Sequence, residues 1–83
     1  MGNIKCNGVN YRQGYLEVMN VHDGFVNLEV WKIHPDIDIS NSLLESSDIE
    51  DKDVVGNVEI ELSADNVKDL ILRLNKCLEE IND

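Results

Sequence analysis

Seven apolar positions near the C-terminus form the longest periodic pattern in this chain. Between Ser63 and the end they recur at intervals of three and four: Val67, Leu70, Ile71, Leu74, Cys77, Leu78 and Ile81. This spacing predicts an amphipathic helix with one apolar stripe. Ser63 suits the N-cap, because its hydroxyl accepts a hydrogen bond from a backbone N–H of the first turn, and Asp65 suits the positive end of the helix dipole.

One leucine of the predicted helix falls outside this stripe. Leu72 lies about 140° around the helix axis from Val67, among charged residues. A single exposed leucine is normal on a protein surface. We therefore expect Leu72→Ser to leave stability nearly unchanged, whereas Leu74→Ala within the stripe is expected to cost roughly 2 to 5 kcal/mol.

Alternating apolar and polar positions predict a hairpin upstream of the helix. Its strands are Tyr15–Val21 and Phe25–Ile33, separated by His22-Asp23-Gly24. A three-residue loop with its glycine in the left-handed conformation pairs Val18 with Leu28, whereas a two-residue loop would set apolar residues opposite charged ones. We expect the three-residue loop. The helix should then cover an inner face made of Leu16, Val18, Val26, Leu28 and Val30.

Two further stretches are predicted to be extended. Asn57–Leu62 alternates strictly, with its apolar residues facing inward and Glu59 and Glu61 outward. Near the N-terminus, Asn7-Gly8 fits a type I′ turn, and the alternating residues Ile4, Cys6, Val9 and Tyr11 flank it. The sequence therefore predicts a single α+β domain over residues 1–83, with a small antiparallel sheet of three to four strands packed against one C-terminal amphipathic helix.

An acidic loop is expected at 35–56. Pro35 ends the strand pattern, and seven carboxylates and one cation give residues 36–53 a net charge of −6: Asp36, Asp38, Glu45, Asp48, Glu50, Asp51 and Asp53 against Lys52. Residues 1–34 sum to zero. The excess negative charge therefore lies downstream of the proline.

The overall charge restricts the class of partner. A net charge of −10 argues against direct binding of nucleic acid or an anionic membrane, because each phosphate contact needs a cation from the protein. We expect a protein with a basic surface instead. Cys6 and Cys77 occur without a signal peptide or a long apolar run, which favours a reduced, cytoplasmic protein.

Metal ligands are suggested only by residues 34–40. Asp36, Asp38 and Ser40 match the first liganding positions of a calcium loop, and His34 precedes them. The turn glycine and the bidentate glutamate of such a loop are missing, because Asn41 and Ser47 stand in their places. We therefore expect no metal site.

Catalytic signatures are equally weak. The predicted register sets Glu17 opposite Glu29, which suits an acid–base pair or a cation site, but like charges opposed across strands also occur at a small cost in stability. The chain has no glycine-rich phosphate loop, no CxxC pair and no HExxH sequence. We expect no enzyme activity and no cofactor.

The second face of the predicted hairpin is too apolar for an ordinary solvated surface. Tyr15 and Trp31 form a cross-strand aromatic pair in the expected register, and Met19, Phe25 and Ile33 lie beside them. Aromatic clusters of this kind are typical anchors of protein interfaces. The alternative is that the acidic loop folds back and covers this face with Leu43, Leu44 and Ile49.

Two functional hypotheses follow. The first is a small acidic, non-catalytic protein-binding module, an inhibitor that occupies a basic, nucleic-acid-binding surface of a partner protein, as a phage-type anti-defence protein would. The second is a homodimeric protein that binds a small ligand in a pocket at the subunit boundary. In the second hypothesis the homodimer forms through this aromatic face, and a homodimer is the expected oligomeric state. The expected partner-binding residues are Tyr15, Met19, Phe25, Trp31, Asp36, Asp38, Asp48, Glu50, Asp51 and Asp53.

Overall fold

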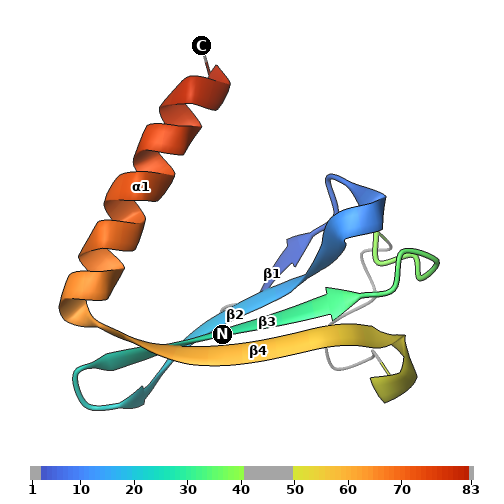
Figure 1. The fold of residues 1–83 in the computed structure, drawn as a ribbon, viewed down its shortest axis with the longest axis horizontal. Coiled ribbons are helices and arrows are strands. Elements are labelled where there is room, and N and C mark those ends of the chain that lie inside the picture. The colour runs from blue at the N-terminus through green and yellow to red at the C-terminus, as the bar shows by residue number, and fades with distance from the viewer. Residues whose placement is uncertain (1–2, 41–49, 83) are drawn as a thin grey trace.

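The computed structural model describes residues 3–40 and 50–82. Its four strands form one antiparallel sheet in the order β1-β2-β3-β4, followed by the C-terminal helix α1 (Figure 1). The predicted α+β class is confirmed. Among the described residues the elements are β1 (Asn3–Cys6), the 3₁₀ turn η1 (Asn10–Arg12), β2 (Gln13–His22), β3 (Phe25–Ile33), the 3₁₀ turn η3 (Asp51–Asp53), β4 (Val54–Ser63) and α1 (Ala64–Asn82).

The β2–β3 hairpin has the predicted register but not the predicted loop. Val18 pairs with Leu28, as expected. β2 continues to His22, so that only Asp23 and Gly24 connect the strands, with φ of Gly24 at 83°. The register is preserved because the pairing shifts at a bulge between Asn20 and His22, which adds the residue that a longer loop would have supplied.

The N-terminal segment does not form the predicted local hairpin. β1 pairs with β2 instead, with Ile4 opposite Leu16 and Cys6 opposite Gly14. The chain between them contains the 3₁₀ turn Asn10–Arg12 rather than a type I′ turn at Asn7-Gly8. Pairing along β2 places Ile4 on the same sheet face as Leu16 and so widens the apolar surface of the sheet. A separate N-terminal hairpin would not have done so.

β4 is longer than the predicted strand and carries the predicted faces. It begins at Val54, so the β3–β4 connection spans residues 34–53 rather than 35–56. Val58 lies opposite Val30, and Ile60 lies opposite Leu28. Nine apolar residues from the four strands therefore share one face, the apolar sheet face: Ile4, Leu16, Val18, Val26, Leu28, Val30, Val58, Ile60 and Leu62.

The helix begins where the sequence predicts. Ser63 caps α1, since its Oγ accepts a hydrogen bond from the backbone N–H of Asn66 at 3.2 Å. In return, the backbone N–H of Ser63 donates to Asn66 Oδ1 at 3.1 Å. The two bonds form a reciprocal box in which asparagine takes the place usually held by glutamate or glutamine.

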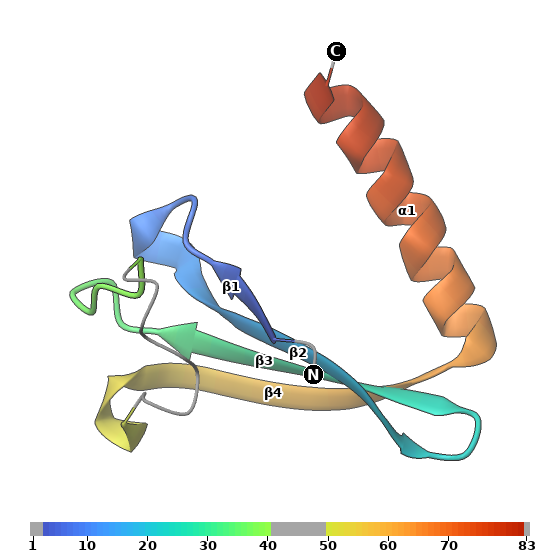
Figure 2. The same ribbon diagram turned by 180° about the vertical axis from the view of Figure 1, so that it is seen from behind.

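The packing of α1 on the sheet is confined to the region next to this cap. The helix contacts β3 and β4 and then diverges from the sheet in both views (Figures 1 and 2). Val67 is half-buried, whereas Leu74 is 58% exposed. Across the gap, Val18, Val58 and Ile60 are also exposed. The expectation that α1 covers the whole inner face is therefore wrong within one chain, because β4 runs into the helix without a loop that would let it turn back.

The most deeply buried residues of the described chain lie on the opposite face of the sheet. Tyr15, Ile33 and Ile39 form this cluster, and Trp31, Ile37 and Val54 pack against it. Ile37 and Ile39 belong to the segment after β3, so the first residues of the predicted acidic loop pack over the aromatic face, as the alternative interpretation required. Leu43, Leu44 and Ile49, the residues expected to cover it, lie outside the described residues.

Candidate functional site

Three glutamates form a straight row across three strands. Glu17 lies opposite Glu29, as the sequence predicts, and Glu29 lies opposite Glu59. Side chains alternate along a strand, so this glutamate row (Glu17, Glu29 and Glu59) shares a face with Tyr15 and Trp31. Like charges directly opposed across strands destabilise a sheet, so a cation from outside the chain would be favoured at this row.

Uncharged donors orient two of the three carboxylates. Glu29 Oε2 accepts hydrogen bonds from Trp31 Nε1 at 3.1 Å and from Asn57 Nδ2 at 3.2 Å. Glu59 Oε2 accepts from Nδ2 of the buried Asn27 at 3.3 Å. Indole and amide groups carry no net charge. These donors orient Glu29 and Glu59 without adding a positive charge to the row. The two asparagines, Asn27 and Asn57, are site residues that the sequence did not predict.

The sheet face that carries the row, the acidic face, has a hollow that borders Glu29 and Glu59. Its volume is about 420 Å³, and its lining includes Met19, His22, Asn27 and Glu61. Nδ1 of His22 contacts Oε1 of Glu61 across the strands. Met19, one of the predicted partner-binding residues, is half-buried at this end of the face, whereas Phe25 is exposed near the hairpin turn.

The predicted aromatic cluster is divided between the core and the surface. Tyr15 and Trp31 do lie opposite each other, but Tyr15 is only 3% exposed beneath the segment after β3. Trp31 is half-buried and borders a hollow of about 500 Å³ whose lining also includes Asp51 and Asn57. Both rings border this hollow, and Trp31 is the more exposed of the two.

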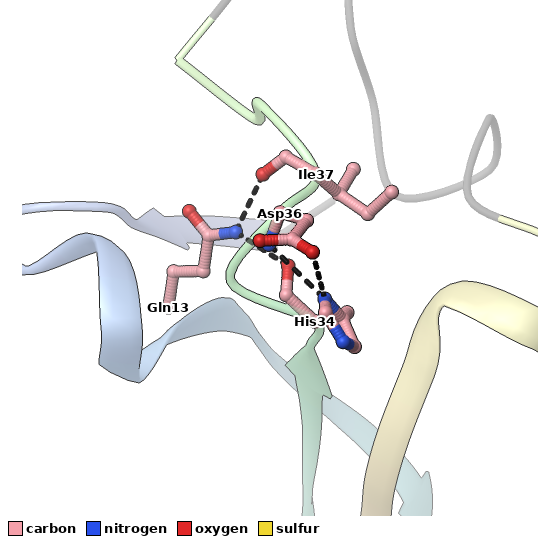
Figure 3. Close-up of polar contacts among 4 residues, drawn as sticks. All are labelled: Gln13, His34, Asp36 and Ile37. Atoms are coloured by element: carbon pink, nitrogen blue, oxygen red, sulfur yellow. Dashed lines mark hydrogen bonds and ion pairs between the residues drawn. The ribbon is translucent and has the colours of Figure 1, made fainter.

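Gln13 anchors the segment that buries Tyr15. Its Nε2 donates to the backbone carbonyl of His34 at 2.9 Å and to that of Ile37 at 2.6 Å (Figure 3). The residue is buried, so these bonds satisfy groups that have little access to water. The pattern of apolar and polar positions did not identify Gln13 as an anchor. The alternation of Ile37 and Ile39 with aspartates was the available signal for a folded segment.

The acidic residues of this segment face solvent. Asp36 and Asp38 are exposed. His34 Nδ1 accepts a hydrogen bond from the backbone N–H of Asp36 at 3.1 Å. Asp38 Oδ1 accepts from the hydroxyl of Ser40 at 2.5 Å and from its backbone N–H at 2.9 Å. These two hydrogen bonds from Ser40, with a smaller contribution from the charge of Lys5, lower the pKa of Asp38.

The remaining predicted acidic residues precede β4. Glu50 is exposed, and its Oε2 lies 3.3 Å from Lys52 Nζ. Asp51 is exposed at the hollow beside Trp31, whereas Asp53 is half-buried. The carbonyl of Asp53 accepts a hydrogen bond from the backbone N–H of His34 at 2.8 Å, which ties the two ends of the connection together. Asp48 lies outside the described residues.

The described residues do not assemble a metal site. Within residues 3–40 and 50–82, no three His, Cys, Asp or Glu side chains group closely enough to hold a metal ion. His34 and Asp36 do approach each other, with 3.8 Å between Nδ1 and Oδ2, but Asp38 is directed to Ser40. Cys6 and Cys77 are both exposed thiols rather than ligands or a disulfide.

Among the described residues, no helix is long and apolar enough to span a membrane, and this includes α1.

Comparison of the chain with protein-family models, with curated proteins and with solved structures finds no match in any of the three.

Proposed function

We propose that this chain is a non-catalytic protein-binding module whose acidic face receives cationic side chains of a partner protein. The observation that carries the proposal is the glutamate row, in which Glu17, Glu29 and Glu59 lie in register on adjacent strands. A lysine or arginine placed over the row would remove the mutual repulsion of the carboxylates. The complementary charges would mainly speed association and select the partner.

Trp31 adds an apolar surface to the same site. It is half-buried, and the hollow beside it has Asp51 and Asn57 on its lining. An arginine guanidinium stacks on an indole ring and also pairs with carboxylates. The combination of Trp31 with Asp51 and the row therefore supports recognition of arginine in particular. Buried contacts of this kind contribute to residence time.

The finer proposal is that the partner's basic surface is one that normally holds nucleic acid. Support comes from the charge: the chain carries −10 overall, and carboxylates occur both on the sheet face and in the connection that precedes β4. A surface that binds phosphates presents the same cations that such a face would attract. Occupation of that surface would make the protein an inhibitor.

An arginine-rich peptide provides a defined probe for the acidic face. Trp31 is the sole tryptophan of the chain, so its emission reports binding locally. The test compares the wild type with a Glu29→Gln/Glu59→Gln variant over a salt series. We expect the wild-type affinity to fall with salt and the variant to bind roughly tenfold or more weakly, because charge-assisted hydrogen bonds each contribute about 1.5 to 3 kcal/mol.

The matched control is Glu79→Gln/Glu80→Gln, which removes the same charge from α1. If the two double variants weaken binding equally, only net charge matters and the proposed face is wrong. The inhibitor proposal needs a second measurement: a partner captured in a salt-dependent pull-down should release labelled duplex DNA when the wild type is added. Retention of the DNA would contradict it.

A further inference from the structure

We propose that a second copy of this chain covers the apolar sheet face, with the helix α1 of each copy lying over the sheet of the other. This surface is distinct from the proposed acidic face, because apolar residues and the glutamate row alternate along the same strands. The dimer therefore does not depend on the proposed function.

Two complementary apolar surfaces are exposed in the single chain. On α1 the stripe includes Leu70, Ile71, Leu74, Leu78 and Ile81, all of them exposed. On the sheet, Ile4, Val18, Val58 and Ile60 are exposed as well. Exposed apolar patches of this extent are unusual in soluble monomers and mark interaction surfaces. Each surface is of the kind that buries the other: a helix stripe and the apolar face of an antiparallel sheet.

The exposed area has the size that a stable dimer needs. The chain exposes 6441 Å², whereas a compact monomer of 9.4 kDa exposes about 5,000 Å². The excess is about 1,400 Å² per chain, or about 2,800 Å² for two copies, which falls in the range of obligate homodimers. The radius of gyration agrees, since it is 14.2 Å against about 12 Å for a compact chain of this length.

The junction between β4 and α1 explains why the helix of the same chain does not close over the sheet. β4 ends at Ser63 and α1 begins at Ala64, with no residue between them. Connections between a strand and a helix that packs back on its sheet usually need about two to six residues. The reciprocal bonds between Ser63 and Asn66 also fix the direction in which the helix leaves. A short connection of this kind favours exchange of the element between two copies.

Charge also favours a second copy on this face. Two chains that each carry −10 would repel each other if their acidic faces met. On β2 and β3, the apolar sheet face consists of the pairs Leu16–Val30, Val18–Leu28 and Asn20–Val26. None of these residues is a carboxylate. Contact through this face leaves both glutamate rows on the outside of the dimer. In a two-fold arrangement, the α1 stripe of each copy then packs on the apolar sheet face of the other copy.

Leu74 and Leu72 provide a matched pair of variants for the test. Both are exposed in the single chain, at 58% and 66%, but only Leu74 belongs to the stripe. Sedimentation at micromolar concentration should give twice the 9.4 kDa chain mass for the wild type and for Leu72→Ser. Leu74→Ser should raise the dimer dissociation constant at least about 100-fold, because two buried leucines are lost per dimer. Leu72→Ser should change it by less than about fivefold.

Two further measurements on the wild-type sequence test the dimer independently of whether the Leu74→Ser variant folds. The melting temperature of the wild type should rise with protein concentration, as linkage to association requires. In a dimer mixed from isotope-labelled and unlabelled chains, the Leu74 methyl groups should show contacts with Val18 or Ile60 methyl groups of the other chain. A monomer with a concentration-independent melting temperature would overturn the proposal. So would a dimer in which these contacts occur only within one chain.

Discussion

Ser63 and Asn66 bond to each other twice, backbone to side chain in both directions, at the point where the last strand becomes the helix. Ser63 is therefore both the final residue of β4 and the cap of α1. This double role leaves no flexible residue at the junction. It determines that α1 diverges from the sheet to which it is joined (Figure 2).

A flexible insertion at this junction should convert the proposed dimer into a monomer. About six Gly and Ser residues between Ser63 and Ala64 would give α1 the connection length found in closed strand–helix units. The helix stripe could then cover the sheet of its own chain. Sedimentation should show the monomer mass, and circular dichroism should show unchanged helix content. The control appends the same residues after Asp83. An insertion variant that stays dimeric would contradict this explanation.

Gly14 should not tolerate a side chain. A Cβ atom there would lie 2.0 Å from the backbone carbonyl oxygen of Trp31, so Gly14→Ala must displace one strand of the hairpin. We expect the free energy of unfolding to fall by about 1 to 3 kcal/mol or more. Gly8 is the control, since a Cβ atom there meets nothing within 4 Å. Urea unfolding of both variants measures the difference, and equal stabilities would contradict the close approach.

Ile39 should be among the most sensitive positions for stability. Its side chain is 0% exposed, in the cluster with Tyr15 and Ile33. Ile39→Ala is expected to cost roughly 2 to 5 kcal/mol in thermal or urea unfolding. The half-buried Ile37 is the control, and Ile37→Ala should cost less. If Ile39→Ala were neutral, the segment after β3 would not cover the aromatic face.

The titration of Asp38 should depend on the hydroxyl of Ser40. The hydrogen bond from that hydroxyl is the largest cause of the lowered pKa of Asp38, followed by the bond from the Ser40 backbone N–H. Ser40→Ala should therefore raise this pKa towards its ordinary value, though not fully, because the backbone bond remains. NMR titration of the Asp38 carboxyl measures the change. Ser40→Thr retains a hydroxyl and should leave the pKa low.

The same hydrogen bonds predict the sign of a pH effect on stability. Since the folded-state pKa of Asp38 lies below its unfolded value, the stabilisation is complete above the unfolded pKa and is lost as pH falls through the folded one. The difference in melting temperature between the wild type and Asp38→Asn should therefore be largest near neutral pH and disappear in acid. A difference that grows in acid would contradict this assignment.

The sequence by itself determined the main elements and the pairing of β2 with β3. The stripe from Val67 to Ile81 and the cap at Ser63 predicted α1, because helix periodicity and capping depend on neighbouring residues. The match of apolar positions predicted the pairing of Val18 with Leu28, since a slip of one residue would turn every apolar side chain to the other face. Glu17 opposite Glu29 followed from the same register.

Only the tertiary structure decided which surfaces are covered. Both faces of the sheet are apolar enough to be buried, so the alternation of residues alone could not predict which segment of the chain packs on which face. Ile39 reaches Tyr15 through a segment held by Gln13, and Glu59 joins Glu29 through a partner strand distant in sequence. These contacts depend on the path of the chain in space. The divergence of α1 likewise depends on the absence of a linker after Ser63. The spacing of apolar residues predicts the helix but does not predict its direction relative to the sheet.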